Sequence, residues 1–175
     1  MMTEKENCEI LFLEPDNEPM LLMVVALINS YAEQGIMLGV TADQLSKIAA
    51  QGLLAVAIDC NKNVIGSAAI TFQYPDGTLE FGGWAVIDEM RKEGVGKHLF
   101  DSILDRAQGN KLVAFGNRNS APIFKKFGAQ PMHQSHMHPD AFVMCETCNC
   151  SGKELLTDGN RCVDTIFDLS SISSG

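Results

Sequence analysis

The spacing of apolar residues predicts two helices in the first third of the chain. Within Glu18–Tyr31, apolar side chains recur three or four positions apart, which places them on one face of a helix. Pro19 suits the first turn of this helix, and Gly35 follows as a stop. Thr41 is a good N-cap, so Thr41–Ala50 is predicted to form a second, shorter helix.

Strand-like segments and turn signals occupy the middle of the chain. Leu53–Ile58 and Val64–Phe72 have the apolar, β-branched character of strands, and the turn Asn61–Asn63 between them predicts a hairpin. Pro75–Gly77 marks another turn, and Leu79–Val86 follows as the next predicted strand.

The second half of the chain predicts helices around a buried strand, followed by an irregular tail. Glu93–Ala107 is interpreted as a loop entering a helix, Leu112–Phe115 as a short strand, and Ser120–Phe127 as a helix that ends at Gly128. With a short edge strand at Glu9–Leu13, this order gives an α/β (α+β) plan with a strand, a glycine-containing loop and a helix at its centre. A chain of 175 residues has room for one domain with a sizeable core.

Charge and hydropathy exclude several classes of protein. The formal net charge is −9, whereas a nucleic-acid binder usually presents a basic face, so we expect no nucleic-acid partner. No apolar run reaches the ~18–20 residues that cross a bilayer, and the N-terminus lacks the residue order of a secretory signal. We therefore expect a cytoplasmic protein with no membrane partner, in which an anionic ligand needs a dedicated pocket of N–H groups and cations.

The most informative segment is the glycine-containing loop. Arg91, Gly94 and Gly96 form an R-x-x-G-x-G pattern between a predicted strand and a predicted helix. Glycine lets backbone N–H groups approach a phosphate without a Cβ clash, and the helix N-terminus adds partial positive charge. The spacing differs from a Walker loop and from a dinucleotide fingerprint. The residues of this predicted pyrophosphate site are Arg91, Lys92, Glu93, Gly94, Val95, Gly96 and Lys97.

The loop and its surroundings resemble the GNAT acetyltransferase family. In that family a strand ending in an L-A-V turn precedes R/Q-x-x-G-x-G/A and a long helix; here Trp84–Val86 fills the first part. A short strand and an Asn-containing helix follow, which Asn117 and Ser120–Gly128 match. The likeness extends from about Ile10 to Met132. We expect a GNAT acyltransferase domain over 1–140 and a cysteine-containing tail, 141–175, that packs on the same domain.

The resemblance implies a fold and a set of cofactor contacts. A mixed central sheet flanked by helices would splay between two parallel strands, and acetyl-CoA would lie in that gap as co-substrate. The backbone around Ala85 would hold the pantetheine arm like an added strand, and the loop N–H groups would take the pyrophosphate. Contacts expected outside the loop are Trp84, Ala85, Val86, Asn117 and Phe124. Members of the family are frequently dimers, so a homodimer is considered, although the sequence shows no interface.

Acyl transfer to an amine needs a base, and Glu80 is the candidate. An α-amine titrates near ~8 and a lysine near ~10.4, so each must lose a proton at neutral pH before it attacks. Glu80 lies on the strand before the loop, where some GNAT members carry a general-base glutamate. A carboxylate there can accept the proton directly or through a water. The alternatives are a solvent-facing glutamate and a structural ion pair.

The sequence offers no clear general acid. Many GNAT enzymes use a tyrosine in the helix after the Asn to protonate the departing thiolate, but Phe124 stands at the matching position and has no proton to give. Ser120 is nearby but weakly acidic, and water can serve because a thiolate is a good leaving group. A non-catalytic acyl-CoA-binding module is therefore an alternative, which the pair Gly82–Gly83 within the strand also leaves open.

The acceptor is suggested by a second resemblance. Val25–Ile48 is similar to the N-acetylglutamate synthase and amino-acid acetyltransferase branch of the family, in which Ile28–Tyr31 matches an L-I-N-x-Y motif. That branch usually carries an arginine where this chain has Val40, and a valine cannot pair with a substrate carboxylate. We expect acetyl transfer to a primary amine of a small molecule or an amino-acid-like substrate; a protein or peptide N-acetyltransferase is the alternative.

The tail carries cysteines at spacings that suit a metal. Thiolate and imidazole ligands favour tetrahedral zinc, but a zinc ribbon needs two C-x-x-C knuckles and only one is present. Reduced structural cysteines, or an oxidisable surface pair, are the alternative. The candidate zinc ligands are Cys145, Cys148, Cys150 and Cys162, with His133, His136 and His138 upstream.

Overall fold

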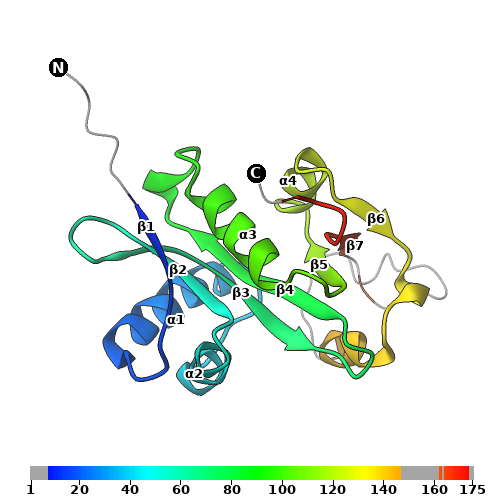
Figure 1. Cartoon of the computed structure of the whole chain (residues 1–175), viewed down its shortest axis with the longest axis horizontal. Coiled ribbons are helices and arrows are strands. Elements are labelled where there is room, and N and C mark those ends of the chain that lie inside the picture. The colour runs from blue at the N-terminus through cyan, green and yellow to red at the C-terminus, as the bar shows by residue number, and fades with distance from the viewer. Residues whose placement is uncertain (1–7, 147–161, 163, 174–175) are drawn as a thin grey trace.

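The protein is built around one mixed sheet, seen in Figure 1. The computed structural model describes residues 8–146, 162 and 164–173. Within these described residues the sheet has seven strands in the order β1-β2-β3-β4-β5-β7-β6, of which only β4 and β5 pair in parallel. The strands are β1 (Glu9–Phe12), β2 (Leu54–Ile58), β3 (Val64–Gln73), β4 (Leu79–Val86), β5 (Leu112–Gly116), β6 (Gln130–Met132) and β7 (Thr165–Asp168). The expected α/β fold with a mixed sheet flanked by helices is confirmed.

Helices cover both faces of the sheet. α1 (Glu18–Ala32) and α2 (Ala42–Ala50) bury Val24, Ile28 and Leu45 against one face. α3 (Val95–Arg106) and α4 (Ala121–Lys126) pack on the other face, where Phe100 and Phe124 join a second core. In Figure 1 this puts α1 and α2 below the sheet and α3 above it.

Local sequence accounts for the helix starts. The Asn17 side chain accepts a hydrogen bond from the Met20 N–H at 3.3 Å, and Pro19 stands in the first turn. Thr41 and Gln44 form a reciprocal capping box at the start of α2, with hydrogen bonds of 2.8 and 3.2 Å. Both starts agree with the expected bounds because they depend only on residues within the first turn.

The expectation of an irregular tail is wrong for two segments. Gln130–Met132 forms β6, and Thr165–Asp168 forms β7, which lies between β5 and β6. Each strand is too short to show alternation, and Pro131 lies within β6. Between them lie the 3-10 helices η2 (Gln134–His136) and η3 (Pro139–Glu146).

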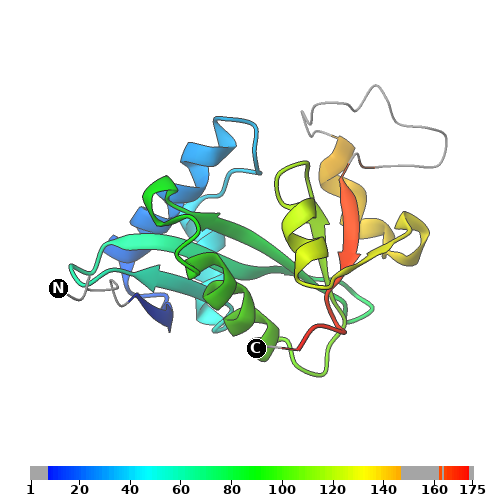
Figure 2. The same ribbon diagram turned by 90° about the horizontal axis from the view of Figure 1, so that it is seen from above.

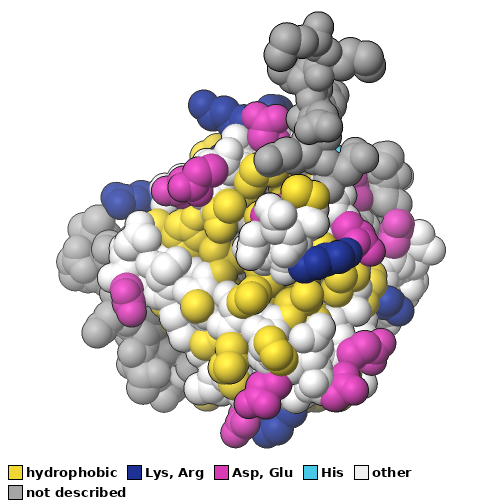
Figure 3. All heavy atoms as spheres, turned by 90° about the vertical axis from the view of Figure 1, so that its left-hand side faces the viewer, with side chains coloured by type: hydrophobic (Ala, Val, Ile, Leu, Met, Phe, Trp, Pro, Cys, Tyr) yellow, Lys and Arg dark blue, Asp and Glu magenta, His cyan; other side chains and the backbone are white. Residues whose placement is uncertain are grey.

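The surface mixes apolar and charged side chains. Figure 3 shows a band of hydrophobic side chains across the face that lies on the left of Figure 1, with acidic side chains mostly at its margin. Leu22 and Met23 on α1 are among the exposed apolar residues. No helix in the described part of the chain is both long and apolar enough to cross a membrane.

Candidate functional site

The two parallel strands part after three residue pairs. β4 and β5 pair at Leu79–Leu112, Glu80–Val113 and Phe81–Ala114 only. Beyond Phe81, β4 continues against β3 as far as Val86, while β5 no longer pairs with it. Figure 2 shows the two strands together at one end and diverging toward the other. This part of β4 presents a strand edge that has no β5 partner among the described residues, so an extended ligand can pair with it.

A β-bulge in β4 lies just beyond the last residue that pairs with β5. The register with β3 shifts between Ala69–Gly82 and Ser67–Ala85, so that Gly83 and Trp84 both stand opposite one β3 residue. Gly83 has φ +58°, and its carbonyl accepts a hydrogen bond of 2.8 Å from Ser67 Oγ. A Cβ on Gly82 would lie 2.9 Å from the Thr71 side chain. The two glycines therefore have a structural role, and their presence is no argument against catalysis.

The loop after β4 presents free N–H groups at a helix start. It runs from η1 (Asp88–Met90) to the N-cap Gly94, with φ +74° at Lys92 and +89° at Gly94. Within the described residues no acceptor takes the N–H groups of Lys92 or of Gly94–Lys97. These groups and the helix macrodipole suit an anion, as expected for a pyrophosphate site.

The expected cations of the loop are partly engaged by the protein itself. Arg91 pairs with Asp88 at 2.9 Å and lies 5.2 Å from the centre of the Tyr31 ring. Lys97 pairs with Asp101 on the next turn of α3. Lys92 is exposed and has no acidic partner among the described residues. The backbone N–H groups and Lys92 are therefore the groups most available to an anion.

Aromatic side chains join the loop to the far side of the gap. Trp84 is half-buried; its Nε1–H donates to the Gly96 carbonyl at 3.1 Å, and its indole lies 5.4 Å from the Phe124 ring on α4. A Cβ on Gly96 would lie 3.6 Å from the Trp84 ring and from Val86, an ordinary contact, so the space beside Gly96 faces the indole. Phe124 is 2% exposed and packs in the core.

Asn117 directly follows β5 and links the start of α4 to the connection between α1 and α2. Its Oδ1 accepts hydrogen bonds from the N–H groups of Asn119 at 2.8 Å and Ser120 at 3.0 Å. Its Nδ2 donates to the Ile36 carbonyl in the connection between α1 and α2. The side chain thus ties the start of α4 to the opposite side of the protein; its contact with a cofactor stays a prediction.

Glu80 lies in the part of β4 that pairs with β5, and its side chain is on the face of the sheet opposite α3. Leu79 and Phe81 pack in the core under α3, and successive side chains of a strand point to opposite faces. The carboxylate accepts a hydrogen bond from the Tyr74 hydroxyl, and Thr71 Oγ1 lies 3.5 Å away. Burial raises the pKa of Glu80, against the two hydroxyl hydrogen bonds, which lower it. Glu80 is half-buried and joins no ion pair among the described residues; its role as a general base stays a prediction.

The sequence of this protein matches a known family over the segment that contains the site. The model of the acetyltransferase (GNAT) family matches residues 24–129, more than half of the chain. The chain belongs to the GNAT acetyltransferase family. This confirms the resemblance and the enzyme class expected from the sequence. A search of curated proteins finds no match.

Solved structures show the same fold. N-acetylglutamate synthase from Neisseria gonorrhoeae, complexed with coenzyme A and N-acetyl-glutamate, is 20% identical with a TM-score of 0.72. That match covers 93% of this chain, but the chain spans about a third (34%) of the Neisseria enzyme. Rv2747 from Mycobacterium tuberculosis, in complex with CoA, is 17% identical with a TM-score of 0.66; the match covers 92% of this chain and 98% of that protein. A Staphylococcus aureus GNAT acetyltransferase is 13% identical with a TM-score of 0.62, covering 93% and 99%.

Two further residues hold this GNAT site together. The Tyr31 hydroxyl on α1 donates to the Val86 carbonyl at 2.7 Å and contacts Asp88 Oδ1 at 3.1 Å; burial first, and then Asp88, raise the pKa of Tyr31. Asn29 exchanges hydrogen bonds of 3.0 and 2.9 Å with the Val40 backbone. Both belong to the motif that suggested the amino-acid acetyltransferase branch, but their roles depend on contacts that the sequence does not reveal.

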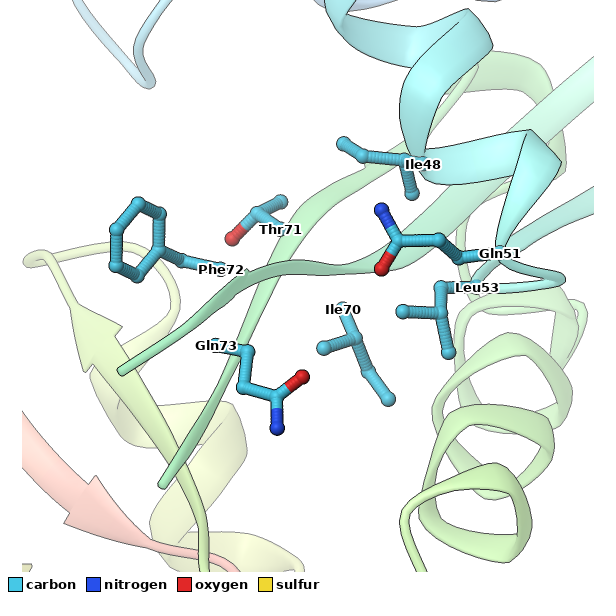
Figure 4. A pocket seen from close by; sticks show the side chains of 7 residues that line it. All are labelled: Ile48, Gln51, Leu53, Ile70, Thr71, Phe72 and Gln73. Carbon is cyan, nitrogen blue, oxygen red and sulfur yellow. The ribbon is translucent and has the colours of Figure 1, made fainter. Parts of the chain in front are cut away.

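A separate hollow lies at the end of β3. It has a volume of about 280 Å3 and lies beside Thr71–Gln73, past the last residue of β3 that pairs with β2 (Figure 4). Ile48, Gln51 and Leu53 form its other wall. Thr71 belongs both to this wall and to the surroundings of Glu80.

The proposed zinc ligands lie largely outside the described residues. Cys148, Cys150 and the side chain of Cys145 lie outside the described part of the chain. Cys162 is buried, and its backbone pairs with the Gln134 side chain at 2.7 and 3.3 Å. Within the described part of the chain, no group of three or more His, Cys, Asp or Glu residues suits a metal ion. His133 contacts Ser135, and His138 lies 3.6 Å from Asp140. Zinc binding stays a prediction without structural support.

Proposed function

We propose that this protein transfers an acetyl group from acetyl-CoA to a primary amine of a small molecule or an amino-acid-like substrate. The observation that carries the proposal is that the unpaired edge of β4 leads directly to a loop with unpaired backbone N–H groups. The edge from Gly82 to Val86 suits the amide-bearing pantetheine arm, and the N–H groups of Lys92 and of Gly94–Lys97 suit the pyrophosphate. Complexes of the structural neighbours with coenzyme A support this assignment.

In the proposed reaction, Glu80 accepts the proton that the amine must lose. The neutral nitrogen attacks the thioester carbonyl, a C–N bond forms and the C–S bond breaks. The nitrogen loses its second proton as the amide forms, and water passes that proton to the CoA thiolate, because Phe124 cannot supply one. A raised pKa brings the Glu80 carboxyl closer to the working pH, which suits a general base.

The acceptor is a small amine or an amino-acid-like molecule under this proposal. The Neisseria enzyme is described in complex with N-acetyl-glutamate and, in a second structure, with L-arginine, which supports an amino-acid-like acceptor. Val40 opposes a free α-carboxylate, because its side chain cannot form an ion pair and its backbone is already held by Asn29. Amines without an α-carboxylate therefore belong in the test beside the amino acids.

The test is turnover of acetyl-CoA with a panel of amino acids, diamines and peptides, in which acetylated product and CoA are both measured by chromatography and mass. We expect at least one amine to be acetylated. Glu80→Gln should lower turnover roughly 10²–10⁴-fold, mainly at low pH where the amine is protonated, and should leave the affinity for CoA unchanged. Glu14→Gln, the same change at an exposed residue outside the site, is the matched control. Binding of acetyl-CoA without product from any amine would favour the non-catalytic binding module.

A further inference from the structure

A second ionisable side chain is fixed against Glu80. Tyr74 follows β3 directly and is 3% exposed. Its backbone N–H donates to the Thr78 carbonyl at 2.8 Å, and its carbonyl accepts from the Gly77 N–H at 2.9 Å, so the β3–β4 turn holds it on both sides. From this place the Tyr74 hydroxyl donates a hydrogen bond to Glu80 Oε2.

The ring of Tyr74 is held by neighbours from several elements. It belongs to a core with Val113 on β5 and Ile166 on β7. The Phe72 ring lies 4.8 Å away and the His138 ring 6.4 Å away, the latter nearly parallel. A ring packed in this way leaves the hydroxyl little freedom to move, so the direction of its hydrogen bond is set by the core.

We propose that Tyr74 is a positioning residue for Glu80, whose hydroxyl fixes the carboxylate and favours its ionised form. This inference rests on the proposed function, because it assumes that Glu80 acts as the base. The Tyr74 proton stays on the tyrosine throughout; the residue donates a hydrogen bond and takes no part in proton transfer. Oε2 faces Tyr74 and Oε1 faces Thr71 at 3.5 Å, and a carboxylate has about four acceptor positions, so capacity remains for the amine proton.

Two opposing effects then set the proton affinity of the base. Burial raises the pKa of Glu80, and the Tyr74 hydrogen bond lowers it. No charged side chain in the described part of the chain contributes to this balance directly. The other titratable groups lie on the far side of Tyr74. His138 lies against the Tyr74 ring, and Asp140 lies 3.6 Å from His138. In the β3–β4 turn, hydrogen bonds from Thr78 and, to a smaller extent, the charges of His138 and Lys111 lower the pKa of Asp76.

The experiment compares Tyr74→Phe with the wild type across pH. Loss of a hydrogen bond to a charged group should raise the pKa of Glu80, so the acidic limb of kcat/KM should move to higher pH by about one unit or more. The KM for acetyl-CoA should not change. Glu80 labelled with 13C in its carboxyl group should titrate at a higher pH in the variant, which NMR measures without substrate. Thr71→Val, which removes the longer contact, should shift the same titration less.

A double variant separates positioning from a merely structural role. In the Glu80→Gln background, Tyr74→Phe should cost almost no further activity, because the group that it positions is gone. Independent, multiplying losses, or an unchanged Glu80 titration in Tyr74→Phe, would overturn the proposal. If Tyr74→Phe does not fold, the shift in Thr71→Val decides, and no shift there counts against it. Failure of the wild type to acetylate any amine would refute the proposed function instead, while the titration still reports on the pair.

Discussion

Gly94→Val separates backbone strain from ligand binding. Gly94 has φ +89° and no atom within 4 Å of an added Cβ, so valine meets no clash but must adopt a left-handed conformation. That conformation costs about 1–2 kcal/mol for a residue with a Cβ. We expect the loop to relieve this strain by rotating its peptide groups, which turns backbone N–H groups away from the anion. Each N–H that leaves a phosphate costs about 1.5–3 kcal/mol, so the Kd for CoA should rise at least about tenfold.

Gly109→Val is the matched control. Gly109 is exposed, has φ +83° and also has no atom within 4 Å of an added Cβ, but it lies in the turn between α3 and β5. Both variants should lose similar stability in chemical denaturation, whereas titration calorimetry should show weaker CoA binding only for Gly94→Val. Equal affinity of the two variants for CoA would refute the assignment of the loop as the pyrophosphate site.

Three further predictions follow from the described contacts. Trp84 is the one tryptophan of the chain, and its indole N–H donates to the Gly96 carbonyl. CoA should therefore change the tryptophan fluorescence, and the titration should give the same Kd as calorimetry. Fluorescence that does not change with CoA would contradict a ligand at the loop. Glu80→Gln should be more stable than the wild type at pH 8 and should lose this advantage toward pH 4. Because burial raises the pKa of Glu80, the protonated carboxyl stabilises the folded wild type at low pH, and this contribution is lost as the pH rises and the carboxyl ionises. Thermal unfolding at both pH values checks the sign. Thr41→Ala removes the capping box and should cost about 1 kcal/mol of unfolding free energy, with no effect on CoA affinity.

Features set by neighbouring residues could be predicted from the sequence. The bounds of β4 agree with the expected Leu79–Val86, and the loop opens a helix at Gly94 as its glycines indicated. The ion pairs of Arg91 with Asp88 and of Lys97 with Asp101 were not anticipated, although each acidic partner lies only three or four residues away; a cofactor contact of either residue stays a prediction. A pattern identifies a cationic residue but does not say what it pairs with.

Features set by distant residues could not be predicted. The Tyr31 hydroxyl meets Val86 across 55 positions, and β7 reaches β5 from the far end of the chain. Tyr74 carries no motif at all, and its link to Glu80 depends on a register that a bulge near Thr71 shifts. The structural role of Gly82–Gly83, which the sequence analysis took only as leaving a non-catalytic module open, could not be predicted for the same reason, since a bulge is visible only once strands are paired.

The position of β7 has a consequence for the order in which the protein assembles. Among the described strands β6 pairs with β7 alone, and β7 also pairs with β5 and places Phe167 against Gly116, where a Cβ would lie 2.6 Å from the ring. During synthesis, the strands that precede Lys97 can pair early, but the free edge of β5 is covered only after Thr165–Asp168 has been made. A nascent chain that stops before Thr165 therefore leaves this edge of β5 without its β7 partner, beside the strand that forms one wall of the gap.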